Sequence, residues 1–152
     1  MIKKLSIIIT VLILVAIMCL SFFNFKNNNK VVMNPNEKLN ESIKTSITKN
    51  DIIDFNKLTN FEWDRMYVIT PYGNPEEFLK KNDVKWIQID TSITMLDDIN
   101  LIVFTNSGRI INYVNFKRKY GDFSISRSRA FGKNDAIFGV VKKNGWVYLI
   151  HK

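Results

Sequence analysis

A long uncharged apolar stretch near the N-terminus constrains this chain more than any other feature. No charged residue lies between Lys4 and Lys26, and the 21 residues Leu5–Phe25 contain only four polar side chains. A helix of that length spans about 31 Å, which matches the roughly 30 Å hydrocarbon core of a bilayer. A buried helix of a cytosolic protein would be shorter and carry a polar face. The stretch therefore predicts an N-terminal transmembrane or signal helix over residues 1–25.

Charge on either side of this stretch predicts its orientation. Lys3, Lys4 and the terminal amine precede it, so the positive-inside tendency places the N-terminus in the cytoplasm. The many Ile, Lys and Asn residues have AT-rich codons, which indicates an AT-rich, bacterial genome. We expect a single-pass protein of the bacterial cell membrane with an extracytoplasmic C-terminal domain. Apolar side chains along the helix would form the anchor: Leu5, Ile9, Leu12, Val15, Leu20 and Phe23.

Three fates remain open for the N-terminal segment. It can stay as an uncleaved anchor, be lipidated at Cys19, or be removed by cleavage before Phe22. A lipoprotein signal peptidase requires a small residue before the cysteine, and Met18 departs from that pattern. The residues Cys19-Leu20-Ser21 fit a soluble-protein cleavage site only loosely. In all three cases the rest of the chain lies outside the cytoplasmic membrane.

Polar residues dominate the next part of the chain. Residues 26–48 are rich in Asn, Lys, Ser and Thr and poor in aromatic side chains, which predicts a polar tether. A weak helical pattern at Ile43 and Ile47 leaves open that part of it packs on the domain. Residues 49–152 form the predicted extracytoplasmic domain.

The first half of this domain mixes helices and strands. Apolar residues near one face predict a short helix over Asp51–Leu58, and aromatic and β-branched residues predict a strand over Phe61–Thr70. Asn74, followed by proline and two glutamates, is typical of a helix start and predicts a helix over 75–82. Val84–Asp90 is a further predicted strand.

The second half predicts two hairpins separated by a long loop. Residues 99–105 and 109–116 flank an Asn-Ser-Gly turn, and residues 136–142 and 146–150 flank Lys-Asn-Gly. Lys117–Asp135 lacks clear periodicity and is predicted to be a loop. The fold class is therefore α+β: a mostly antiparallel sheet of five or six strands with two short helices.

Two of the predicted strands are apolar on both faces. They are residues 101–104 and 146–150, whereas a small antiparallel sheet normally has one solvated face. Either the helices cover the second side, or part of it is a docking surface.

Positive charge is concentrated in the last third of the chain. Residues 108–152 contain ten Lys and Arg against two acidic residues, whereas residues 24–107 contain ten against twelve. Such cations attract anionic lipid head groups or wall polymers, although a solvated face that keeps the domain soluble has the same composition. Nucleic-acid binding shares the electrostatics, but a location outside the membrane argues against it. The predicted anionic-partner residues are Lys117, Arg118, Lys119, Arg127, Arg129 and Lys133.

The scarcity of Cys and His limits the available chemistry. Cys19 and His151 are the single residues of their types, so one chain cannot form a disulfide or a Cys/His zinc site. A histidine one residue from the C-terminus is also poorly placed to act as a rigid general base. We expect no metal, no cofactor and no catalytic residue.

The leading hypothesis is a non-enzymatic, membrane-anchored accessory or binding protein whose basic third faces an anionic envelope polymer, surface or protein. One alternative is a small envelope-polysaccharide hydrolase, in which Glu62 and Asp64 share one strand face at a separation that glycoside cleavage permits. A second alternative is an inhibitor or immunity-type binder using an aromatic sheet face. The aromatic candidates for that face are Trp63, Tyr67, Tyr72, Trp86 and Trp146.

Two stretches carry a resemblance to known proteins. They are Phe61–Val68 with Pro71-Tyr72, and Asn115–Ser124. Both resemble segments of small uncharacterised lipoprotein-like or membrane-anchored extracytoplasmic proteins of low-GC Gram-positive bacteria. The resemblance implies an anchored extracytoplasmic domain and assigns no catalytic residue.

Overall fold

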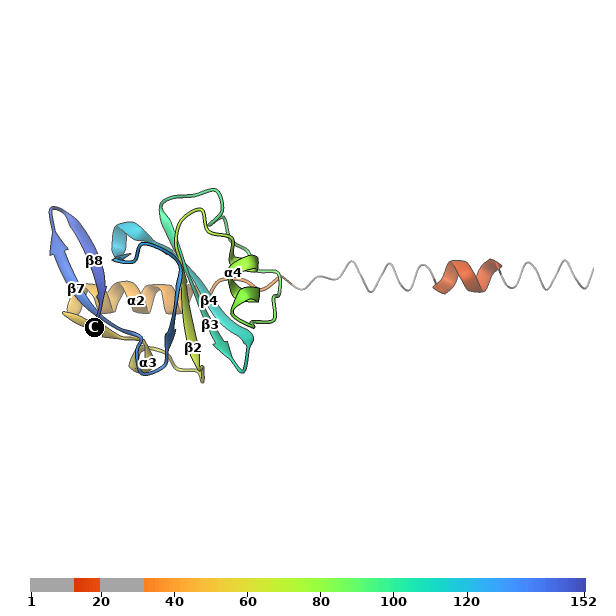
Figure 1. Cartoon of the computed structure of the whole chain (residues 1–152), viewed down its shortest axis with the longest axis horizontal. Helices are drawn as coiled ribbons and strands as arrows, with labels where there is room; N and C mark the ends of the chain where they lie inside the picture. Colours follow the sequence, from red (N-terminus) through yellow and green to blue (C-terminus); the bar gives the residue numbers. More distant parts are fainter. Residues whose placement is uncertain (1–12, 20–31) are drawn as a thin grey trace, which may run out of the picture. The chain divides into compact units, whose positions relative to one another are not determined.

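The computed structural model describes residues 13–19 and 32–152 (Figure 1). The chain divides into two units, residues 1–31 and 32–152, and each is described by itself. In the first unit, residues 13–19 are helical, and Val15 within them is 53% exposed. Among the described residues, no helix has both the length and the apolar character needed to cross a bilayer. The other predicted anchor residues lie outside the described ranges: Leu5, Ile9, Leu12, Leu20 and Phe23.

The second unit contains two four-stranded sheets (Figure 1). The strand order is β4-β3-β2-β6 in one sheet and β1-β7-β8-β5 in the other, and all pairs are antiparallel except β5 with β8. The α+β class is confirmed, with eight strands rather than five or six. Their bounds are β1 Ile52–Asp54, β2 Arg65–Ile69, β3 Ile99–Asn106, β4 Arg109–Lys117, β5 Asp122–Phe123, β6 Arg129–Gly132, β7 Ile137–Lys143 and β8 Trp146–His151.

Strand β3 is buried on both faces, which answers the question raised by its apolar sequence. Ile102 and Phe104 belong to a core formed with the inner face of the second sheet. Leu101 and Val103, on the opposite face, belong to a second core with side chains from residues 78–93. Burial of one side chain of this size contributes about 1.5–3 kcal/mol to the free energy of folding. Both covers therefore stabilise β3.

A helix occupies part of the segment predicted to be a tether. Helix α2 covers Glu37–Lys49, and the Asn36 side chain accepts a hydrogen bond from the Leu39 N–H at 2.9 Å to cap it. Leu39, Ile43 and Ile47 lie four residues apart on one helix face and are buried in the core between the sheets. Residues 37–48 of the predicted tether are therefore helical and packed on the domain, as the pattern at Ile43 and Ile47 had left open, because a narrow apolar stripe is enough to pack the helix. Residues 26–31 lie outside the described ranges.

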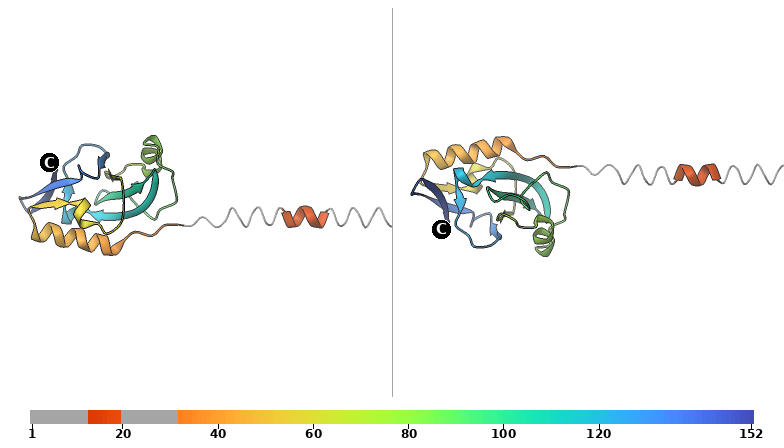
Figure 2. Two further views of the ribbon diagram at one scale, coloured as in Figure 1. Left: turned by 90° about the horizontal axis from the view of Figure 1, so that it is seen from below. Right: turned by 90° about the horizontal axis from the view of Figure 1, so that it is seen from above.

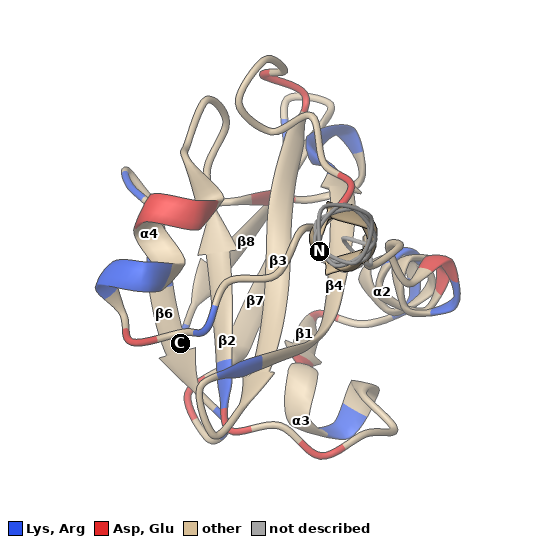
Figure 3. Cartoon of the chain, turned by 90° about the vertical axis from the view of Figure 1, so that its right-hand side faces the viewer, with Lys and Arg blue, Asp and Glu red and all other residues tan. Residues whose placement is uncertain are grey.

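Helix α4 forms as predicted, over Pro75–Lys81. The Asn74 side chain caps the Glu77 N–H at 3.2 Å. Figure 3 shows acidic residues in its first turn and basic residues in its last turn, which suits the helix dipole. Both views in Figure 2 place α2 and α4 on opposite sides of the second unit.

The remaining predicted elements are confirmed in part. Both hairpins form, as β3–β4 and β7–β8. The predicted helix over Asp51–Leu58 is instead β1 followed by α3, Phe55–Leu58. The predicted strand Val84–Asp90 makes only isolated bridges. The predicted loop Lys117–Asp135 contains a 3-10 helix, Arg118–Tyr120, together with β5 and β6.

The buried Tyr113 in β4 connects Met33, at the start of this unit, to the sheet β4-β3-β2-β6. Its hydroxyl donates to the Met33 carbonyl at 2.7 Å and accepts a hydrogen bond from the Asp90 N–H at 3.0 Å. Burial raises the pKa of Tyr113, and burial likewise raises that of Tyr67.

These pKa shifts predict a loss of stability at alkaline pH. Folding holds both phenols neutral, so their contribution is complete below the unfolded pKa of about 10 and is lost as the pH rises toward the folded values. We expect the free energy of unfolding to fall above pH 10, by up to about 1.4 kcal/mol per pH unit for each group. Urea unfolding at a series of pH values measures this slope. Tyr67→Phe should reduce it, whereas Tyr72→Phe, at a residue 65% exposed, should leave it unchanged.

Candidate functional site

Strand β6 forms one edge of the sheet β4-β3-β2-β6. It pairs antiparallel with β2, from Arg129 opposite Val68 to Gly132 opposite Arg65. Within the described residues, no strand pairs with its other side. An open edge of this kind presents backbone N–H and C=O groups that can pair with another chain.

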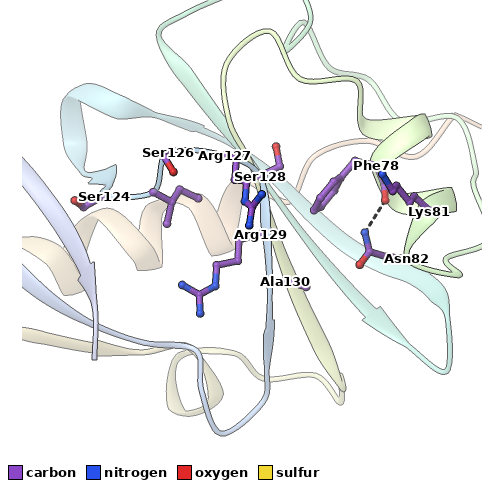
Figure 4. Close-up of a pocket in the computed structure, with 10 residues that line it drawn as sticks. Phe78, Lys81, Asn82, Ser124, Ser126, Arg127, Ser128, Arg129 and Ala130 are labelled. Carbon is purple, nitrogen blue, oxygen red and sulfur yellow. Dashed lines mark hydrogen bonds between the residues drawn. The ribbon is translucent and has the colours of Figure 1, made fainter.

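A groove of about 880 Å³ follows this edge (Figure 4). In the close-up, Phe78 and Lys81 lie on one flank, and the Arg129 side chain points away from them on the other. Side chains from both faces of β6 therefore border the groove. The lining residues are Phe78, Lys81 and Asn82 from the end of α4, Ser124, Ile125, Ser126, Arg127 and Ser128 from the segment that leads into β6, and Arg129 and Ala130 from β6 itself.

The short loop between β2 and α4 sets the distance between the end of α4 and the segment before β6, which line opposite sides of the groove. The Ser128 hydroxyl accepts a hydrogen bond from the Thr70 N–H at 3.1 Å, which joins the end of β2 to the segment before β6. A Cβ at Gly73 would come within 2.8 Å of a methyl carbon of Ile69 and 2.9 Å of the Thr70 carbonyl oxygen. Glycine therefore lets the chain fold back closely before Pro75 begins α4.

The charges of the groove are of one sign. Lys81, Arg127 and Arg129 border it, and none of its lining residues is acidic. Within the described part of the chain, none of these three cations forms an ion pair. The Arg129 guanidinium lies 5.3 Å from the centre of the Phe131 ring. An exposed arginine can hold a carboxylate or a phosphate with two parallel hydrogen bonds.

The six predicted anion-binding residues therefore have different surroundings. Arg127 and Arg129 border the groove, whereas Lys117 borders a smaller pocket of about 360 Å³ that it shares with Glu37 and Lys44. Lys81 was missed by sequence reasoning, because a lysine in the last turn of a helix is already accounted for by the dipole.

The other three predicted cations have partners inside the fold. Arg118 contacts both carboxylate oxygens of Asp122, at 2.9 and 2.7 Å, and donates to the Asp97 carbonyl at 2.7 Å. The hydrogen bonds to Asp122 raise the pKa of Arg118. Lys133 lies 2.9 Å from Glu62, and Lys119 lies over the Tyr120 ring at 4.9 Å.

The carboxylates proposed for a hydrolase also have separate partners. Asp64 accepts hydrogen bonds from the Thr105 hydroxyl at 3.0 Å and the Ser107 N–H at 2.7 Å, which supports the β3–β4 turn. The Glu62 side chain is 85% exposed and contacts Lys133. Neither carboxylate lines the groove. In the described part of the chain, no three His, Cys, Asp or Glu side chains converge to hold a metal ion.

The predicted aromatic residues do not share one face. Trp63 and Tyr67 are buried in different cores, while Tyr72 and Trp146 are exposed. Exposed apolar side chains do occur on the outer face of the second sheet, where Ile52 and Ile150 flank Gly139 in neighbouring strands. The inhibitor or immunity-type binder using an aromatic sheet face stays a prediction.

Comparison of the chain with protein-family models, curated proteins and solved structures gave no match. The resemblance to anchored proteins of low-GC Gram-positive bacteria stays a prediction.

The different surroundings of the arginines predict different effects on stability. Arg118→Ala leaves the half-buried Asp122 without its cation, and we expect it to lower the free energy of unfolding by about 2 kcal/mol. Arg127→Ala removes an exposed side chain without an ion pair and should change that free energy by less than about 0.5 kcal/mol. Urea unfolding of the two variants compares them directly. Equal losses of stability in the two variants would contradict the conclusion that Arg118 stabilises the fold and Arg127 does not.

Proposed function

We propose that this chain is a non-enzymatic, membrane-anchored extracytoplasmic binding protein whose groove along β6 takes an anionic partner. The observation that carries the proposal is a groove bordered by Lys81, Arg127 and Arg129, which form no ion pair within residues 13–19 and 32–152, and lined by no acidic residue. Arg118, which stabilises the fold, has a carboxylate partner, whereas the three groove cations have none among the described residues. Cations that served only solubility would not need to gather around one groove with serine hydroxyls.

The serines of the groove support binding rather than nucleophilic catalysis. A serine nucleophile needs an adjacent base, and no His, Asp or Glu lines the groove. The single histidine, His151, packs its ring against Phe131 and Phe138, and its Nε2 lies 2.7 Å from the Asp135 carbonyl oxygen. Ser128 already contacts Thr70 through its hydroxyl.

The anchored, extracytoplasmic location rests on the N-terminal sequence. Leu5–Phe25 is apolar, uncharged and long enough to span a bilayer, and two lysines precede it. In that location, the groove would meet polymers and proteins of the cell envelope, many of which are anionic.

The location predicts which side of the membrane a thiol on the domain faces. In a chain carrying Cys19→Ser and Lys57→Cys, the new thiol replaces a side chain that is 85% exposed. A membrane-impermeant maleimide should label it in intact bacterial cells as completely as in lysed cells. Labelling that requires lysis would place the domain in the cytoplasm and contradict the proposal.

The groove predicts charge-dependent binding of polyanions. The full chain, held in nanodiscs of zwitterionic lipid, should bind teichoic acid or polyglutamate in a salt-sensitive manner. Reversing two groove cations in Arg127→Glu with Arg129→Glu should weaken binding about tenfold or more, measured by titration calorimetry.

The matched control is Lys142→Glu with Lys143→Glu, which changes the net charge equally at exposed positions of the β7–β8 hairpin. It should retain most of the affinity. An equal loss in both variants would mean that net charge alone governs binding, and no loss in either would remove the groove as the site.

A further inference from the structure

We infer that the partner taken by this groove is an extended acidic polypeptide segment, which pairs with β6 as an added fifth strand of the sheet β4-β3-β2-β6. The inference rests on the proposed function and names the class of its anionic partner. Strand addition is an established mode of peptide recognition, in which backbone hydrogen bonds give affinity and side-chain contacts give specificity.

The backbone of β6 is oriented for such pairing. N–H and C=O groups of successive strand residues point to opposite edges of the strand. The Thr70 N–H bonds on the β6 side of β2, so Val68, two residues earlier, also faces β6 and the opposing Arg129. Ala130 follows Arg129, so its N–H and C=O point to the open edge. Ala130 is also one of the residues that line the groove.

The side chains around this edge fit an acidic segment with alternating apolar residues. Arg129 and Ala130 are successive strand residues and lie on opposite faces of the sheet. On the Arg129 face, guanidinium groups would meet carboxylates, while on the Ala130 face the half-buried Phe78 ring offers an apolar contact. A polysaccharide or teichoic acid would use the cations but leave the strand's backbone groups unpaired.

A second copy of this chain is a poorer occupant of the same edge. Antiparallel pairing of two β6 strands would bring the Arg127 and Arg129 side chains of both copies together. Like charges opposite each other destabilise a strand pair. Charged residues on edge strands commonly prevent such self-association, and here the same charges favour an acidic partner.

The test uses the full chain in zwitterionic nanodiscs and a capped hexapeptide of alternating Glu and Val as the probe. Two N-methylated versions carry the methyl groups on the Glu residues or on the Val residues, so charge is kept and one set of backbone donors is removed. Only one set faces β6 in an added strand. One version should therefore lose at least about tenfold in affinity, by fluorescence anisotropy, while the other binds nearly as well as the parent peptide.

Two measurements on the protein accompany the peptide series. Hydrogen exchange at the Ala130 amide should slow by about tenfold or more when peptide is bound, because that N–H becomes hydrogen-bonded. Ala130→Pro removes the outward N–H at an edge position where proline is tolerated, and it should weaken peptide binding about tenfold or more. Urea unfolding of the variant, with a transition like that of the wild type, shows that it is folded.

Each other outcome overturns a different statement. If both N-methylated peptides bind like the parent and the Ala130 amide exchanges freely, strand addition is wrong, while loss of binding in the Arg127→Glu and Arg129→Glu variant would keep the anionic-partner function. If that variant binds every probe like the wild type, both proposals fail. Protection of Ala130 that grows with protein concentration without peptide would assign the edge to a second copy.

Discussion

Burial of β3 on both faces is the constraint on which the rest of the second unit depends. One face needs the second sheet and α2, and the other needs α4 with the segment that follows it. The helices of both covers precede β3 in the chain, and the second sheet is completed only after the chain leaves the first sheet. The chain does so after the four residues of β6, where the Asp135 N–H bonds to the Gly132 carbonyl at 3.0 Å and β7 begins in the second sheet. Because β7 joins the other sheet, no described strand pairs with the outer edge of β6.

Local signals in the sequence predicted the elements that local interactions stabilise. The α4 cap and both hairpins follow from residues only a few positions apart. Strands β5 and β6 were not predicted, because each is short and pairs with a distant partner: Phe123 lies opposite Leu149, and Arg129 lies opposite Val68. Helix α2 was obscured by polar composition, although its stripe of Leu39, Ile43 and Ile47 had the helical period.

The candidate site shows the same division between local and distant information. The sequence indicated that the last third of the chain is basic, but it did not show which cations are already neutralised. Lys133 contacts Glu62, which lies 71 residues away, and this contact depends on the fold. Lys81 comes from a helix far from the basic third in sequence, and it lines the same groove as Arg127 only in the folded chain. The groove is thus a property of the tertiary structure.

Tyr113 has a mechanical consequence. Its hydroxyl bonds to the Met33 carbonyl, and its own carbonyl accepts a hydrogen bond from the Asn36 N–H at 2.9 Å. Tension applied at Val32 would therefore load two bonds on one residue of β4 before it reached α2. Hydrogen bonds that must break one after another resist pulling less than bonds loaded together. Because both bonds lead to Tyr113, force entering at this point would be borne by β4, an edge strand of its sheet, as well as by α2.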